Sequence, residues 1–146
     1  MPERQTLKRA RRDAAEGKAP STQAGEFVRE QIHHIRQGKH GARSTRQAIA
    51  IGLSEARRAG VPLPPPAGRG EVSRKARRDL QAGKRGTKPS PKRSHARVKA
   101  LQKEGRAAAS HAALSRQARQ AARKRGAADR SRAAKKAART RQRAAA

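Results

Sequence analysis

Arginine and lysine are the residues of this sequence whose types and spacing point most directly to chemistry. The chain has 39 of them against 10 Asp and Glu in 146 residues, for a formal net charge of +29. Cations at this density neutralise a phosphate backbone, and release of its counterions favours binding. Arginine outnumbers lysine, 27 to 12, which favours bidentate phosphate contacts and insertion into the minor groove. The clusters that we predict to bind nucleic acid contain Arg9, Arg11, Arg12, Arg43, Arg46, Arg57, Arg58, Lys75, Arg77, Arg78, Lys84, Arg85, Lys92, Arg93, Arg123, Lys124, Arg125, Lys135, Lys136, Arg139, Arg141 and Arg143.

The scarcity of aromatic residues bears on the type of nucleic acid. Proteins that read single strands stack the bases on aromatic side chains, and Phe27 is the one Phe, Tyr or Trp here. We therefore predict sequence-independent binding and compaction of duplex DNA, as by a histone-like nucleoid-associated protein. Association with RNA or the ribosome is the alternative. Base reading by a helix-turn-helix is disfavoured because no polar set points to base edges. In that arrangement the groove or its phosphates would face Arg43, Arg46, Arg57 and Arg58.

A metal site is the other chemistry that the spacing allows. Glu26, Glu30 and His34 recur at four-residue steps, with His33 and His40 nearby, and catalytic zinc commonly has three such protein ligands. The same side chains would lie along a polar helix face, where their charges offset neighbouring arginines. We favour this simpler interpretation and predict neither a metal nor another cofactor.

Enzymatic catalysis finds no support in the residue types. The chain has no Cys, no Gly-x-Ser-x-Gly elbow and no phosphate-cradling glycine loop. We predict a non-enzymatic protein without a small-molecule substrate. Binding to an anionic membrane surface is disfavoured because Leu101 and Leu114 are isolated in a tail with little else to insert. No apolar run approaches the roughly 20 residues of a membrane span, and no signal peptide is visible, so we expect a cytoplasmic, nucleoid-associated protein.

The elements that must position the cations centre on residues 21–60. Ser21 suits a helix N-cap, and apolar residues then recur at three- and four-residue steps as far as Ile35. Ser44, with a Gln three residues on, indicates a capping box at the start of a second helix, whose apolar face includes Gly52 and allows close approach of the two helices. The pair forms a helical hairpin. It buries few side chains, so we expect it to order through DNA or self-association.

The rest of the chain is interpreted as extensions of this hairpin. We predict a basic N-terminal helix within residues 1–20, a Pro/Gly linker over 61–70 and a Lys/Arg/Ala-rich cationic tail over 71–146. Repulsion between like charges opposes helix formation in the free tail, and phosphate contact relieves it. The predicted fold class is therefore all-α, a small helical hairpin with largely disordered or transiently helical basic extensions.

A short basic motif occurs twice in the sequence. Ala-Arg-Arg-Asp, with Gly-Lys four residues after the Asp, is found at residues 10–18 and again at 76–84. Each copy indicates a short basic helix stopped by glycine. Chance repetition in an Arg- and Ala-rich composition explains the pair equally well, and in either case the motif supplies clustered cations.

The core of the chain resembles a known family. The run from Gln47 to Arg57, Q-A-I-A-I-G-L-S-E-A-R, and the preceding Gly25-Glu-Phe-Val-Arg-Glu30 are similar to short basic bacterial proteins catalogued as a domain of unknown function. The resemblance covers about residues 21–66, and some members are labelled DNA-binding. It implies the helical hairpin and brings no catalytic residue, while the partner stays open. The tail is similar in composition to histone-like basic tails.

Overall fold

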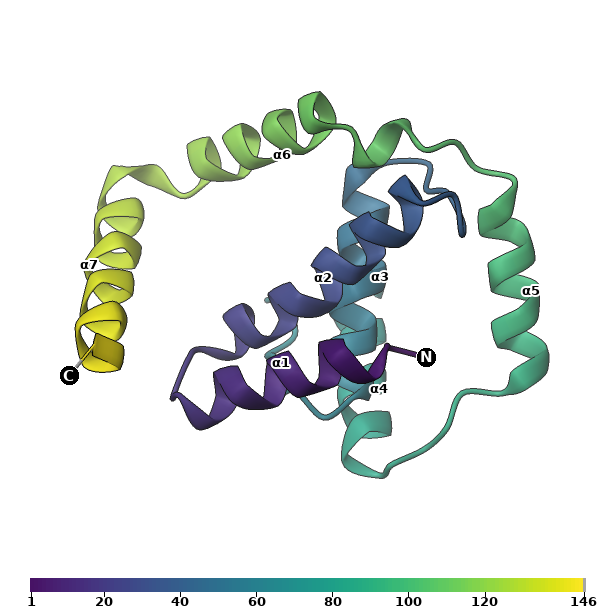
Figure 1. Ribbon diagram of the computed structural model, residues 1–146, viewed down its shortest axis with the longest axis horizontal. Helices are drawn as coiled ribbons and strands as arrows, with labels where there is room; N and C mark the ends of the chain where they lie inside the picture. Colours follow the sequence, from purple (N-terminus) through teal and green to yellow (C-terminus); the bar gives the residue numbers. More distant parts are fainter. Residues whose placement is uncertain (146) are drawn as a thin grey trace.

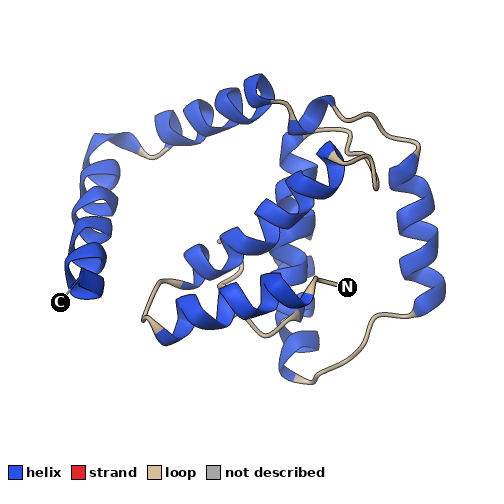
Figure 2. Ribbon diagram, in the orientation of Figure 1, coloured by secondary structure: helices blue, strands red, loops and turns tan. Residues whose placement is uncertain are grey.

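The computed structural model describes residues 1–145, which are almost entirely helical (Figures 1 and 2). No strand occurs in this part of the chain, so the predicted all-α class is confirmed. The elements are α1 (Arg4–Ala15), α2 (Pro20–Arg36), α3 (Thr45–Arg58), α4 (Glu71–Lys84), α5 (Pro91–Gln102), the 3₁₀ turn η1 (Ala107–Ala109), α6 (His111–Lys124) and α7 (Gly126–Ala145).

Helices α2 and α3 pack against each other across a short loop and form the centre of the molecule. The predicted close approach at Gly52 is confirmed, because a Cβ there would lie 2.6 Å from Val28 Cα. The predicted cap of α3 is also present. Ser44 Oγ accepts from Gln47 N at 3.2 Å, and Gln47 Oε1 accepts from Arg43 N at 2.7 Å. Helix α2 begins slightly earlier than predicted, at Pro20, whose fixed φ suits the first helical position.

The core consists of two small clusters of apolar side chains. One surrounds Phe27, which is fully buried, and the other surrounds Ile35. Segments outside the α2–α3 pair contribute to both. The Phe27 cluster contains Ala10, Ala24, Ala56, Val61 and Leu63, and the Ile35 cluster contains Ile32, Ala42, Ala48, Ala108 and Ala109. The core is therefore built from more helices than the two of the predicted hairpin.

The extensions differ from the largely disordered or transiently helical segments that we predicted. Helix α1 packs on α2 and α4 packs on α3. A Cβ on Gly83 would lie 2.0 Å from Arg57 O, so this glycine allows α4 to touch the backbone at the end of α3. Burial of one face of each helix supplies the stabilisation that propensity alone does not give to short helices.

The turn η1 ties a distant part of the chain back to the central pair. Thr45 Oγ1 donates to Ala108 O at 2.7 Å, and Arg36 Nε donates to Ala109 O at 2.9 Å. In the same region Gly41 N donates to Leu101 O at 2.9 Å. We call the two side-chain bonds from Thr45 and Arg36 to η1 the clasp. It fixes the point from which α6 begins.

Beyond the core, α5, α6 and α7 stand away from the other helices. Figure 1 shows α5 separate from the centre and α6 and α7 extending in succession toward the C-terminus. Helix α6 touches the core near its start, where Leu114 packs on the Ile35 cluster, and α7 contacts α6 alone among the elements. No helix within residues 1–145 is long and apolar enough to cross a membrane.

Candidate nucleic-acid interface

The two copies of the Ala-Arg-Arg-Asp motif lie on α1 and α4, the helices that flank the central pair. In each copy the alanine and the aspartate are buried and the two arginines between them are exposed. The shared pattern of exposure gives the repeat a structural meaning, because each copy docks through its Ala and Asp and presents an arginine pair to solvent. These exposed pairs are Arg11 with Arg12 and Arg77 with Arg78.

Each motif aspartate is held by cations. Asp13 Oδ1 is 2.7 Å from Lys18 Nζ. Asp79 accepts from Arg58 Nε at 2.8 Å and Lys75 Nζ at 2.7 Å, and also from Ser54 Oγ. Burial alone would raise the pKa of Asp79, but the hydrogen bonds from its three donors outweigh burial and lower it. Asp79 is therefore an ionised anchor between α3 and α4.

Several arginines and lysines that we predicted to bind nucleic acid have contacts within the fold. Arg57 is buried, and its guanidinium donates to Leu63 O at 3.2 Å and Pro64 O at 3.1 Å. Burial lowers the pKa of Arg57, although the charge of Asp79 opposes the shift. Arg9 Nε lies 2.7 Å from Glu26 Oε2. Because Arg57 is enclosed and holds the Pro-rich segment against α3, it has no place in the interface proposed below.

The other predicted residues of the core and of α5 lie at the surface. Arg43 and Arg46 are exposed on either side of the Ser44 cap, at the positive end of α3. This position adds the helix dipole to their charge, which favours an anion. The predicted residues Lys84 and Arg85 at the end of α4, and Lys92 and Arg93 near the start of α5, are also exposed. They lie at different points along the chain and form no single cluster.

Helices α6 and α7 together carry the densest positive charge. Residues 111–145 contain twelve basic residues and one acidic residue, and all twelve basic residues are exposed. Neither helix has a buried residue. Asp129, the single carboxylate, pairs with Arg132. We call residues 111–145 the cationic arm.

Regular spacing gathers some of the arm's cations on one side of each helix. Lys136, Arg139 and Arg143 follow at steps of three and four residues on α7, so they share a face. Arg116 and Arg119 form such a row with Arg123 on α6. Sequence reasoning chose the densest clusters and missed Arg116, Arg119, Arg130 and Arg132. The three- and four-residue spacing would have found all of these except Arg130.

The segment of this chain that is similar to known proteins lies at the centre of the structure. Residues 17–66 match a family of unknown function (DUF6496). The matched segment contains α2, α3 and the Pro-rich segment, and it leaves out α1, α4 and the cationic arm. The predicted resemblance to a family of unknown function is confirmed over this segment. No curated protein and no solved structure matches the chain.

Proposed function

We propose that the protein binds duplex DNA without sequence preference and compacts it, as a non-enzymatic protein of the bacterial nucleoid. The cationic arm carries this proposal. Twelve exposed cations with a single carboxylate over 35 residues have few partners within the protein. A polyanion relieves their mutual repulsion, and release of its counterions makes the contact favourable.

Exposed cations on the core, in addition to those of the arm, support compaction as well as binding. The exposed arginine pairs of α1 and α4, with Arg43 and Arg46, lie on the folded core, whereas the arm extends away from it. One molecule thus has cations in two separate places. A protein of this kind neutralises the backbones of two duplex segments at once and holds them together.

Burial of Phe27 favours a duplex over a single strand. Phe27 has 0% of its surface exposed, and the sequence has no Trp or Tyr. The chain therefore presents no such ring on which an unpaired base stacks. Contacts to phosphates are available to Arg and Lys regardless of base sequence, which supports recognition of the backbone.

A salt titration of the full chain tests the proposal. Affinity for duplex DNA, duplex RNA of the same length and anionic vesicles is measured over a tenfold range of salt. We expect tightest binding to DNA and a steep linear fall of the logarithm of the binding constant with the logarithm of salt. Equal or tighter binding to RNA would indicate that the partner is the ribosome or another structured RNA. Preference for vesicles would refute nucleic acid as the partner.

Substitutions in α7 test the role of the arm. Replacing Lys136, Arg139 and Arg143 with glutamine removes three phosphate contacts, which reduces the salt slope by about 2.7, from roughly 0.9 per contact. The matched control replaces Arg139 and Arg143 with lysine, which keeps the charge and therefore the slope. A slope unchanged by the glutamine substitutions would show that α7 does not contact DNA.

A further inference from the structure

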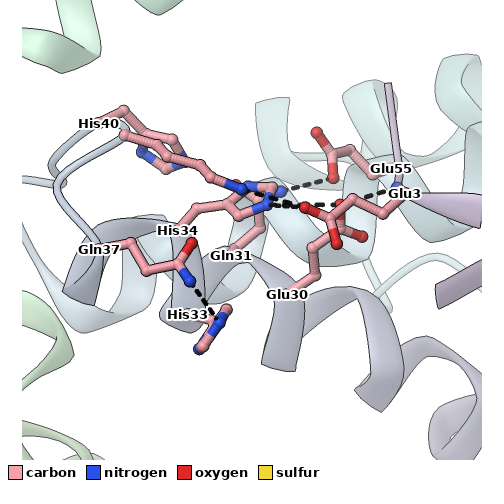
Figure 3. Close-up of polar contacts among 9 residues, drawn as sticks. Glu3, Glu30, Gln31, His33, His34, Gln37, His40 and Glu55 are labelled. Carbon is pink, nitrogen blue, oxygen red and sulfur yellow. Dashed lines mark hydrogen bonds and ion pairs between the residues drawn. The ribbon is translucent and has the colours of Figure 1, made fainter. Parts of the chain in front are cut away.

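One group of side chains away from the cationic arm combines the ligand types of a metal site. Glu3 precedes α1, and Glu30 and His34 lie one turn apart on α2. Figure 3 shows these three side chains directed toward one another. His34 Nε2 is 2.9 Å from Glu3 Oε1 and 3.8 Å from Glu30 Oε1, and a ligand atom from each residue lies within 4.8 Å of the other two.

The environment of Glu30 points to a ligand that the protein itself does not supply. Its side chain is 3% exposed. Oε1 accepts from Glu3 N at 2.9 Å, but Oε2 is buried without a hydrogen-bond partner. A buried carboxylate oxygen with no partner is costly. The hydroxyl oxygen of Thr6 is also buried and unpartnered, and Thr6, Glu3 and Glu30 line one cavity of about 480 Å³.

Negative charge is concentrated here in an otherwise strongly basic chain. Glu55, which accepts from Gln31 Nε2 at 2.7 Å, is close enough to Glu30 for the two charges to interact. Burial raises the pKa of Glu55, and the charge of Glu30 raises it further. Lys39 Nζ, at 3.1 Å from Glu3 Oε1, compensates part of this charge at the exposed edge. The charge of the N-terminal ammonium acts in the opposite direction on Glu55 and lowers its pKa.

We propose that Glu3, Glu30 and His34 bind a divalent transition-metal ion of the zinc type. Imidazole nitrogen and carboxylate oxygen are both zinc ligands, with bond lengths of about 2.0–2.2 Å. Three ligand atoms around one such ion lie roughly 3–3.5 Å apart in tetrahedral geometry, close to the separations in the structure. Water from the adjacent cavity completes the coordination. The bound ion joins the segment before α1 to α2.

This ligand set differs from the one that the sequence spacing allowed. Glu26, one turn before Glu30, is not a member because it pairs with Arg9 at 2.7 Å and Arg29 at 4.0 Å. Glu3, which is 27 residues from Glu30 in the sequence, takes the place of Glu26. The interpretation that Glu26 offsets nearby arginines is thus supported by its contacts.

Titration of the full chain with Zn²⁺, followed by calorimetry, and with Co²⁺, followed by visible absorption, tests the site. We expect one ion per chain. His34→Ala, Glu30→Gln and Glu3→Gln should each weaken binding by at least the 10- to 100-fold that loss of an outer-shell partner costs. His33→Ala is the matched control, because His33 is the exposed neighbour of His34 on the same helix, and it should leave the affinity unchanged. Far-UV circular dichroism checks that each variant is folded.

Lys39→Met separates a built site from casual binding to surface histidines. The substitution removes the ammonium that competes for Glu3, so the designated site should bind Zn²⁺ more tightly. If Zn²⁺ instead binds at another histidine, this substitution should leave the affinity unchanged. The proposal is overturned if the wild-type chain binds no ion, or if His34→Ala binds Zn²⁺ as tightly as the wild-type chain does.

Discussion

Replacing Gly52 with alanine perturbs the closest contact between α2 and α3. In an exposed helix this change raises the free energy of unfolding by about 1 kcal/mol, because alanine loses less backbone entropy than glycine on folding. At Gly52 the new Cβ would lie 2.6 Å from Val28 Cα, 2.8 Å from Val28 N and 3.0 Å from Phe27 C. All three are backbone atoms, so no side-chain rotation relieves the overlap and the two helices must separate. Overpacking of this kind costs typically 1–3 kcal/mol.

Gly25 provides a control in the other helix of the pair. A Cβ at Gly25 meets nothing within 4 Å, so Gly25→Ala should raise the free energy of unfolding by about 0.5–1 kcal/mol. Gly52→Ala should lower it by about 1–3 kcal/mol. Denaturant unfolding followed by far-UV circular dichroism measures both. A Gly52→Ala variant as stable as Gly25→Ala would refute the helix contact on which the fold depends.

Three further predictions follow from buried polar groups. Arg57→Ala should reduce the free energy of unfolding by about 1–3 kcal/mol, because Leu63 O and Pro64 O lose their donor. The salt slope of DNA binding should stay the same. A smaller salt slope in this variant would place Arg57 at the interface after all. The lowered pKa of Asp79 implies a stabilisation that is present above the unfolded pKa of about 3.9 and lost as pH falls through the folded value. An Asp79→Asn variant should therefore lose less stability than the wild-type chain between neutral and acid pH. Parallel curves of unfolding free energy against pH for the two proteins would contradict this role. Thr45→Val should cost about 1–3 kcal/mol by leaving Ala108 O unpaired, and an unchanged unfolding midpoint would show that the clasp contributes no stability.

Local sequence signals predicted the central pair of helices well. The apolar steps that lead to Ile35, the Ser44 cap and the small residue at position 52 each have one physical cause that is visible within a few residues. Ser44 satisfies a free backbone donor of its own helix, and Gly52 lies on a face whose other members are apolar. Such features need no knowledge of distant parts of the chain, so single-sequence reasoning finds them.

Features that depend on distant segments escaped sequence reasoning. The buried alanines Ala108 and Ala109 lie in a stretch whose composition resembles the rest of the tail, and nothing local shows that Thr45 and Arg36 will bind their carbonyl groups. The role of Arg57 was missed for the same reason, since an arginine near a helix end is usually exposed. Glu3 joins Glu30 and His34 only because α1 folds onto α2, which no local spacing predicts.

The clasp has a consequence for the order in which the protein folds and opens. Its hydrogen bonds join residues 63 and 73 positions apart, whereas the contact from Gln31 to Glu55 spans 24. Closing the longer loop costs more chain entropy, so the central pair can form before the clasp does. Local opening of the clasp would then release η1, α6 and α7 while α1 to α4 stay folded, and the bond from Gly41 N to Leu101 O would still hold the end of α5. Two hydrogen bonds, the contacts of Ala108 and Ala109, and the packing of Leu114 thus control how far the cationic arm can reach.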